Sequence, residues 1–98
     1  MTTTSVDIGE LIVQTPDIRG GRPRIAGTGV TVQRIAGWYK LGLTPEEIVR
    51  QIGHLALAQV YAALTYYHAN RDEIEAAIRA EALEADRLER LHYQAHKG

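Results

Sequence analysis

Residues 20–32 read Gly-Gly-Arg-Pro-Arg-Ile-Ala-Gly-Thr-Gly-Val-Thr-Val, and this stretch divides two differently patterned parts of the chain. A helix does not tolerate glycine and proline at this density, because glycine is too flexible and proline lacks the backbone donor. Before the stretch lies a short β-prone run, Leu11-Ile12-Val13, that Pro16 ends. Within it, residues 24–26 and 29–32 flank a Gly-Thr turn around which they can pair. We therefore predict a small β-hairpin-like cap over residues 6–31.

Apolar residues return with helical spacing after the cap. Val32, Ile35, Ala36 and Tyr39 fall on one face of a helix, and Gly42 is placed to end that helix in the left-handed conformation.

The strongest local start signal belongs to the second helix. Thr44 is the expected N-cap, Pro45 occupies the first helical position and Glu47 completes a capping box. Leu43 and Ile48 supply the hydrophobic staple that fixes the direction in which the chain enters the helix.

A third helix follows the break at residues 53–54. Its predicted buried stripe consists of Leu57, Val60, Tyr61, Leu64 and Tyr67 or His68. Its N-cap position holds Ala56 in place of a polar residue, which costs about 1 kcal/mol.

The fourth helix is predicted to begin after Asn70, which would form a capping box with Glu73, and to run to about Leu91. Its apolar stripe is clear at first and thin later, so its distal part either projects into solvent or meets a partner. Glu75 with Arg79, and Asp86 with Arg90, are i, i+4 pairs of the stabilising orientation.

These elements define one domain over residues 1–98 with a mainly α fold. Its parts are the β-rich cap, a three-helix bundle of the helix-turn-helix sort over residues 32–70, and a C-terminal helical arm over residues 71–92.

Composition excludes several classes of protein. The chain has 98 residues and no cysteine, so a disulfide scaffold, thiolate metal sites and cysteine catalysis are excluded. No apolar run reaches the ~18 residues of a membrane span, and no signal peptide is visible, so we expect a cytoplasmic protein without membrane contact. Residues 18–50 carry a net charge of +4 and residues 72–89 carry −5, which indicates a basic surface and an acidic arm.

The sequence does not predict an enzyme, a metal site or a cofactor. The glycine pairs lack the lysine of a phosphate-binding loop and the context of a dinucleotide site. His92 and His96 have the i, i+4 spacing of two metal ligands, but no third ligand sits at a diagnostic offset.

Binding surfaces are better supported. Arg19, Arg22, Arg24 and Arg34 lie near the glycine-rich turn, where they would either contact phosphates or form a solvated face. In the third helix Gln59 is the one side chain suited to reading a base, namely adenine. Two aromatic residues that fall off the stripes, Trp38 and Tyr66, are candidates for a self-association or partner surface.

Three blocks of the chain resemble the antitoxin-like domain-of-unknown-function family 433. The first is residues 16–32, with its Gly-Gly-basic-Pro step (Gly20-Gly21-Arg22-Pro23) and its Gly27-Thr28 pair. The second is Gly42-Leu43-Thr44-Pro45-Glu46-Glu47-Ile48, and the third is Ala62-Ala63-Leu64-x-Tyr66-Tyr67.

The resemblance implies a homeodomain-like bundle and a bacterial antitoxin that neutralises a cognate PIN-like ribonuclease toxin. We expect such a protein to form a homodimer; autoregulation through operator DNA is the alternative function. The resemblance also implies that Gly20, Gly21, Arg22, Pro23, Gly27 and Thr28 shape a turn and a surface without a catalytic role. This chain departs from the family pattern at Gly29, where the family usually has arginine, and at Gly53 and Ala56.

Overall fold

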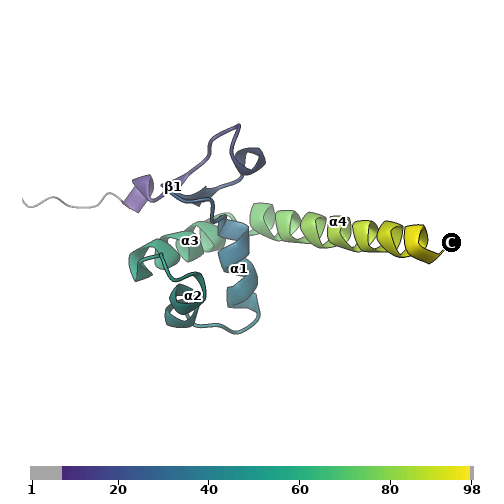
Figure 1. Ribbon diagram of the computed structural model, residues 1–98. Helices are drawn as coiled ribbons and strands as arrows, with labels where there is room; N and C mark the ends of the chain where they lie inside the picture. The colour runs from purple at the N-terminus through teal and green to yellow at the C-terminus, as the bar shows by residue number, and fades with distance from the viewer. Residues whose placement is uncertain (1–7, 98) are drawn as a thin grey trace, which may run out of the picture.

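The computed structural model describes residues 8–97, which form four α-helices preceded by a two-stranded sheet (Figure 1). In chain order the elements are η1 (Ile8–Glu10), β1 (Ile12–Val13), η2 (Arg19–Gly21), β2 (Arg24–Ile25), α1 (Val32–Lys40), α2 (Pro45–Ile52), α3 (Leu57–Ala69) and α4 (Arg71–Lys97). The predictions of a mainly helical chain, an N-terminal pair of strands and a long C-terminal helix are confirmed. Residues 1–7, with the first two positions of the expected cap, lie outside the described residues.

The strands pair more widely than the sequence indicated. β1 and β2 are antiparallel, with Ile12 opposite Ile25. The predicted pairing around the Gly-Thr turn also forms, through a bridge between Arg24 and Thr31 and a 2.9 Å hydrogen bond from Ile25 N–H to the carbonyl of Val30. The cap is thus a three-segment unit that leads directly into α1.

Helices α1, α2 and α3 pack around one core to which the cap contributes Ile25 and Val30. The stripe predicted for α3 is partly wrong, because Leu57 is 39% exposed and Tyr61 is 49% exposed. Of the two alternatives at its end, Tyr67 is buried and His68 is exposed. Ala62 and Ala63, which the predicted stripe left out, are buried. The buried face of α3 consists of Val60, Ala62, Ala63, Leu64 and Tyr67.

Both ends of α2 follow the sequence prediction. Thr44 Oγ1 accepts a hydrogen bond from Glu47 N–H at 3.2 Å, and Glu47 Oε1 accepts one from Thr44 N–H at 3.0 Å, so the capping box is complete. Gly53 ends the helix at φ 81°, a conformation that glycine adopts without strain.

The predicted start of α4 is correct, but the contact expected to cap it does not form. Asn70 makes no capping box with Glu73, both of which are described; its Nδ2 instead donates to the carbonyl of Tyr66 at 3.1 Å. One residue therefore joins α3 to α4. The helix runs to Lys97, farther than the predicted end near Leu91.

Only the N-terminal part of α4 touches the bundle, as far as Glu81, which accepts a hydrogen bond from Gln33 Nε2 on α1. Ile74 is 1% exposed, whereas every side chain over residues 79–93 is exposed. The helix has 27 residues and is about 40 Å long. Figure 1 shows most of it projecting beyond the bundle.

Candidate functional site

The first half of the glycine-rich stretch forms a tight left-handed turn. Arg19, Gly20 and Gly21 have φ values of 51°, 64° and 77°. Glycine adopts this conformation freely, but Arg19 pays about 1 kcal/mol for it. Two neighbours of this turn hold it in place, since Gly21 N–H donates to the carbonyl of Ile18 at 3.0 Å and Gln14 Nε2 donates to that of Gly21 at 3.3 Å.

The Gly-Thr pair forms the second turn. Gly27 has φ 76°. Thr28 Oγ1 donates to the carbonyl of Ile25 at 2.8 Å and accepts from Val30 N–H at 3.1 Å. Both residues therefore contribute to the turn itself.

Arg24 is a structural residue and not part of an exposed basic surface. It is 8% exposed, and its guanidinium donates to the carbonyl of Thr28 at 2.8 Å and to Thr15 Oγ1 at 3.0 Å. Its Nε has no hydrogen-bond partner among the described residues. A buried charge is tolerated only when it is hydrogen-bonded, and these two bonds serve that need while they link the two turns. Because the Arg24 side chain is buried, it is not accessible to a ligand at the surface.

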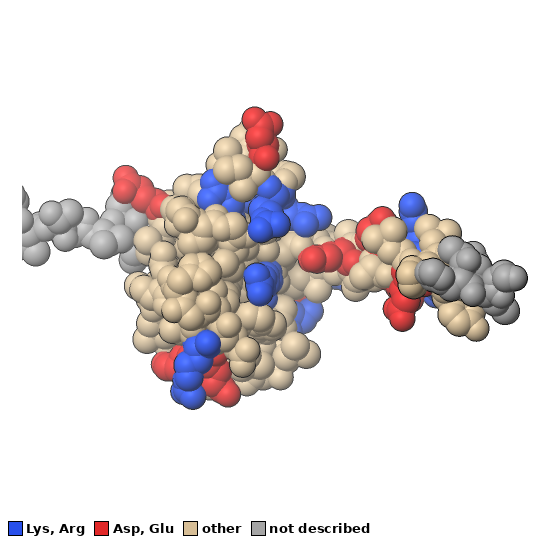
Figure 2. Space-filling view, viewed as in Figure 1, with Lys and Arg blue, Asp and Glu red and all other residues tan. Residues whose placement is uncertain are grey.

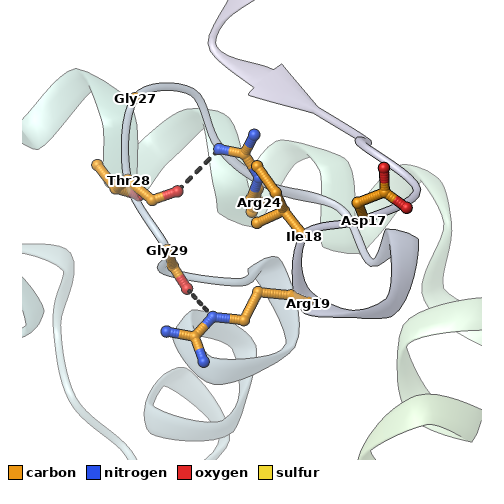
Figure 3. A pocket seen from close by; sticks show the side chains of 7 residues that line it. All are labelled: Asp17, Ile18, Arg19, Arg24, Gly27, Thr28 and Gly29. Atoms are coloured by element: carbon orange, nitrogen blue, oxygen red, sulfur yellow. Dashed lines mark hydrogen bonds between the residues drawn. The ribbon is translucent and has the colours of Figure 1, made fainter.

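Arg19 holds the same turn from the other side. Its Nε donates to the carbonyl of Gly29 at 3.1 Å, so two arginines bind the successive carbonyls of Thr28 and Gly29 (Figure 3). A shallow pocket lies between the turns, lined by Asp17, Ile18, Arg19, Arg24, Gly27, Thr28 and Gly29. We call this arrangement the arginine clamp.

Three arginines, one of them Arg19 of the clamp, form an exposed basic recess beside it. It is lined by Arg19, Arg22, Gly29, Thr31, Gln33, Arg34 and Glu81. The Arg34 guanidinium also stacks 5.1 Å from the centroid of the Trp38 ring. Figure 2 shows basic side chains gathered where the cap meets the base of α4. Three of the four predicted arginines therefore share a surface, and Arg24 does not.

Other predicted site residues have local roles. Pro23 is buried, and its carbonyl accepts from Val32 N–H at 2.9 Å. Gln59 Oε1 accepts from Ala56 N–H at 2.6 Å, which supplies half of the cap that α3 otherwise lacks. Tyr66 is half-buried against the core, and burial raises the pKa of its hydroxyl.

A network that the sequence analysis missed anchors α4. Glu75 was expected to pair with Arg79 but binds Lys40 Nζ at 2.5 Å and accepts from the Tyr67 hydroxyl. The hydrogen bond from Lys40, followed by that from Tyr67, lowers the pKa of the Glu75 carboxyl. The bond to Glu75, followed by burial, raises the pKa of Tyr67. Local spacing gave no signal for this network, because its residues come from three helices.

Beyond its anchor, α4 carries a stripe of exposed apolar side chains on the face turned away from the bundle, which we call the outer stripe. Leu83 is 70% exposed and Leu91 is 51% exposed. The Asp86–Arg90 pair, predicted from the sequence, forms at 2.8 Å. The outer stripe consists of Ala76, Ala80, Leu83 and Leu91, at spacings of about one or two helical turns.

Within residues 8–97, no group of three or more histidine or acidic side chains could hold a metal ion. No helix in the same range is long and apolar enough to cross a membrane.

A search of curated proteins finds no match to the chain. The chain is similar to the crystal structure of a DUF433 member protein from Anabaena variabilis ATCC 29413, with 27% sequence identity, a TM-score of 0.67, and coverage of 71% of this chain and 69% of that one. Residues 12–67, which include both clamped turns, α1, α2 and all but the last two residues of α3, match the family described as protein of unknown function (DUF433). The chain therefore belongs to the DUF433 family.

Proposed function

We propose that this protein is an antitoxin-like, cytoplasmic protein-binding module that neutralises a cognate PIN-like ribonuclease. The observation that carries the proposal is the outer stripe of α4. Large apolar side chains such as Leu83, left exposed on a projecting helix, are typical of a surface that a partner covers.

The charges of α4 sharpen the expected mode of binding. The acidic excess of residues 72–89 lies partly at the base of the helix, where Glu75 is already paired with Lys40. Farther out, acidic and basic residues are mixed around the outer stripe: Glu81, Glu84, Asp86 and Glu89 stand among Arg79, Arg87 and Arg90. We therefore propose that apolar contact supplies most of the affinity for the ribonuclease and that the charged residues form the rim of the interface.

The homeodomain-like, helix-turn-helix identity of the bundle is part of the proposal. Its support is the arrangement of α2 and α3, which are joined by residues 53–56 with a left-handed Gly53.

Co-expression of the full chain with the PIN-like ribonuclease encoded beside its gene tests the proposed function. Leu83→Glu should reduce capture of the ribonuclease at least tenfold, because it places a charge in the apolar contact. Tyr93→Glu is the matched control, since Tyr93 is a large side chain of the same helix that is 65% exposed and lies outside the outer stripe. Equal capture by both variants and the unmodified chain would contradict the proposal.

Operator DNA is the second candidate partner, which the basic recess favours. Arg22 and Arg34 are exposed there and make no ion pair with any described residue. The composition of α3 disfavours DNA binding, because this helix contains no lysine or arginine to contact phosphates. A salt-titrated mobility-shift assay on the chain's own promoter decides between the two. Binding at low salt that Arg22→Ala weakens supports DNA recognition, and absence of a shift ends it.

A further inference from the structure

The face of α4 that packs on the bundle continues beyond it in the same phase. Its positions alternate at spacings of four and three residues, the pattern of a coiled-coil seam. Ile74 at its start is 1% exposed, whereas Leu88 farther along is 54% exposed. The inner seam, as we name it, consists of Ile74, Ile78, Glu81, Ala85, Leu88 and His92.

A groove between α1 and α4 opens onto this seam. Its apolar lining comes from Gly37, Trp38 and Leu41 on α1 and from Ile78, Ala82 and Ala85 on α4. Leu41 is 78% exposed. Arg34 and Glu81 also line the groove and provide its charge.

We propose that a second copy of this chain packs on the groove, with the two α4 helices antiparallel and related by a two-fold axis. The seam is self-complementary in that arrangement. In an antiparallel pair the small Ala85 of one copy faces the large Leu88 of the other, and the two-fold axis repeats this contact. Alternating small and large residues let helices approach closely without leaving a cavity.

The charges favour the same register. With Ala85 opposite Leu88, Glu81 of one copy, which also accepts a hydrogen bond from Gln33 Nε2 of its own chain, lies opposite His92 of the other. Glu89 of the second copy then lies beside Ala82 and within reach of Arg34, so a carboxylate meets a guanidinium that has no ion pair among the described residues of its own chain. In this arrangement the Glu89 carboxylate of one copy pairs with the Arg34 guanidinium of the other.

This contact uses a face of α4 other than the outer stripe and needs no ribonuclease, so it goes beyond the proposed function. The mass of the purified full chain, measured by light scattering over a concentration series, tests the dimer independently of the proposed function. The unmodified chain and Leu83→Glu should be dimers. Leu88→Glu should raise the dimer dissociation constant roughly a hundredfold or more, because it removes one buried leucine from each half of the interface. A monomeric unmodified chain, or a dimer that Leu88→Glu leaves intact, overturns the proposal.

Cysteine cross-linking tests the register, and the absence of native cysteine makes it clean. Two helix faces offer the same residue pair at the same spacing: Ala85 with Leu88 on the inner seam, and Ala80 with Leu83 on the outer stripe. The variant Ala85→Cys/Leu88→Cys should form a covalent dimer on oxidation, because position 85 of one copy then meets position 88 of the other. Ala80→Cys/Leu83→Cys should stay largely uncrosslinked. Equal cross-linking of the two variants, or none at the inner seam, overturns the antiparallel arrangement.

A charge swap tests the pair across the interface. Arg34→Glu alone and Glu89→Arg alone should each weaken the dimer severalfold, and the double variant should recover much of the loss. Losses that simply add in the double variant contradict the predicted contact.

Discussion

The guanidinium of Arg19 occupies the space that a side chain on Gly29 would need. A Cβ built on Gly29 would lie 2.9 Å from Arg19 Nη2, and Arg19 Nε donates to the carbonyl of the same glycine. At this position the sequence departs from the arginine that the family usually has. This chain has glycine at position 29, yet a guanidinium lies beside that position, because Arg19 reaches it from the facing turn.

This relationship predicts a coupling between the two positions. Gly29→Ala should destabilise the fold by about 1 kcal/mol, because the methyl group displaces Arg19 and breaks its hydrogen bond. In the Arg19→Ala background the same change should be neutral, or stabilising by about 0.5 kcal/mol, since alanine restricts the unfolded chain and Gly29 does not have a positive φ. Urea unfolding of all four variants measures the coupling, and strictly additive effects would show that the two residues do not interact.

The buried end of the clamp gives a second prediction. Arg24→Lys should destabilise the fold by about 2 kcal/mol, because an ammonium does not bridge Thr28 and Thr15 as the guanidinium does. Arg22→Lys, at an exposed position in the same turn, is the control and should change stability by less than about 0.5 kcal/mol. Similar unfolding midpoints for the two variants would argue against a structural role for Arg24.

The anchor of α4 should respond to acid. The folded-state pKa of Glu75 is lowered, so its contribution to stability is present above the unfolded pKa and is lost as the pH falls through the folded pKa. Glu75→Gln should therefore be less stable than the unmodified chain at neutral pH and should lose less stability on acidification. Unfolding curves between neutral and acidic pH test this, with Glu84→Gln on the exposed part of α4 as the control. Parallel pH profiles for the unmodified chain and Glu75→Gln would contradict the role given to the network.

The incomplete cap of α3 offers a stabilising change. Ala56 has the extended backbone of an N-cap (φ −85°, ψ 154°), and Gln59 already bonds back to it. The Gln59 N–H donates to the Ala56 carbonyl at 3.0 Å, and Ala56→Ser should add the side-chain acceptor of a true N-cap for the same N–H, stabilising the fold by about 1 kcal/mol. Ala58→Ser, inside the first turn of the helix, is the control and should not stabilise. A lower thermal midpoint for Ala56→Ser would show that the residue does not act as the cap.

The sequence by itself determined the features that depend on neighbouring residues. The capping box of Thr44 and Glu47 and the left-handed end at Gly53 follow from local backbone chemistry, and so do the two glycine turns. Apolar spacing and caps likewise predicted the four helices, and the i, i+4 spacing of opposite charges predicted the Asp86–Arg90 pair, because each depends on contacts within about one helical turn.

Tertiary packing decided the rest. Arg24 lies inside the fold while Arg22 remains outside, although both are basic residues beside Pro23 in the sequence. Glu75 binds Lys40 and not Arg79, because the end of α1 lies against the first turns of α4. These choices depend on which elements meet in space, and the spacing of residues along one helix carries no information about a partner 35 positions away. For the same reason, only the packed structure shows where the bundle ends along α4 and where the exposed faces of that helix begin.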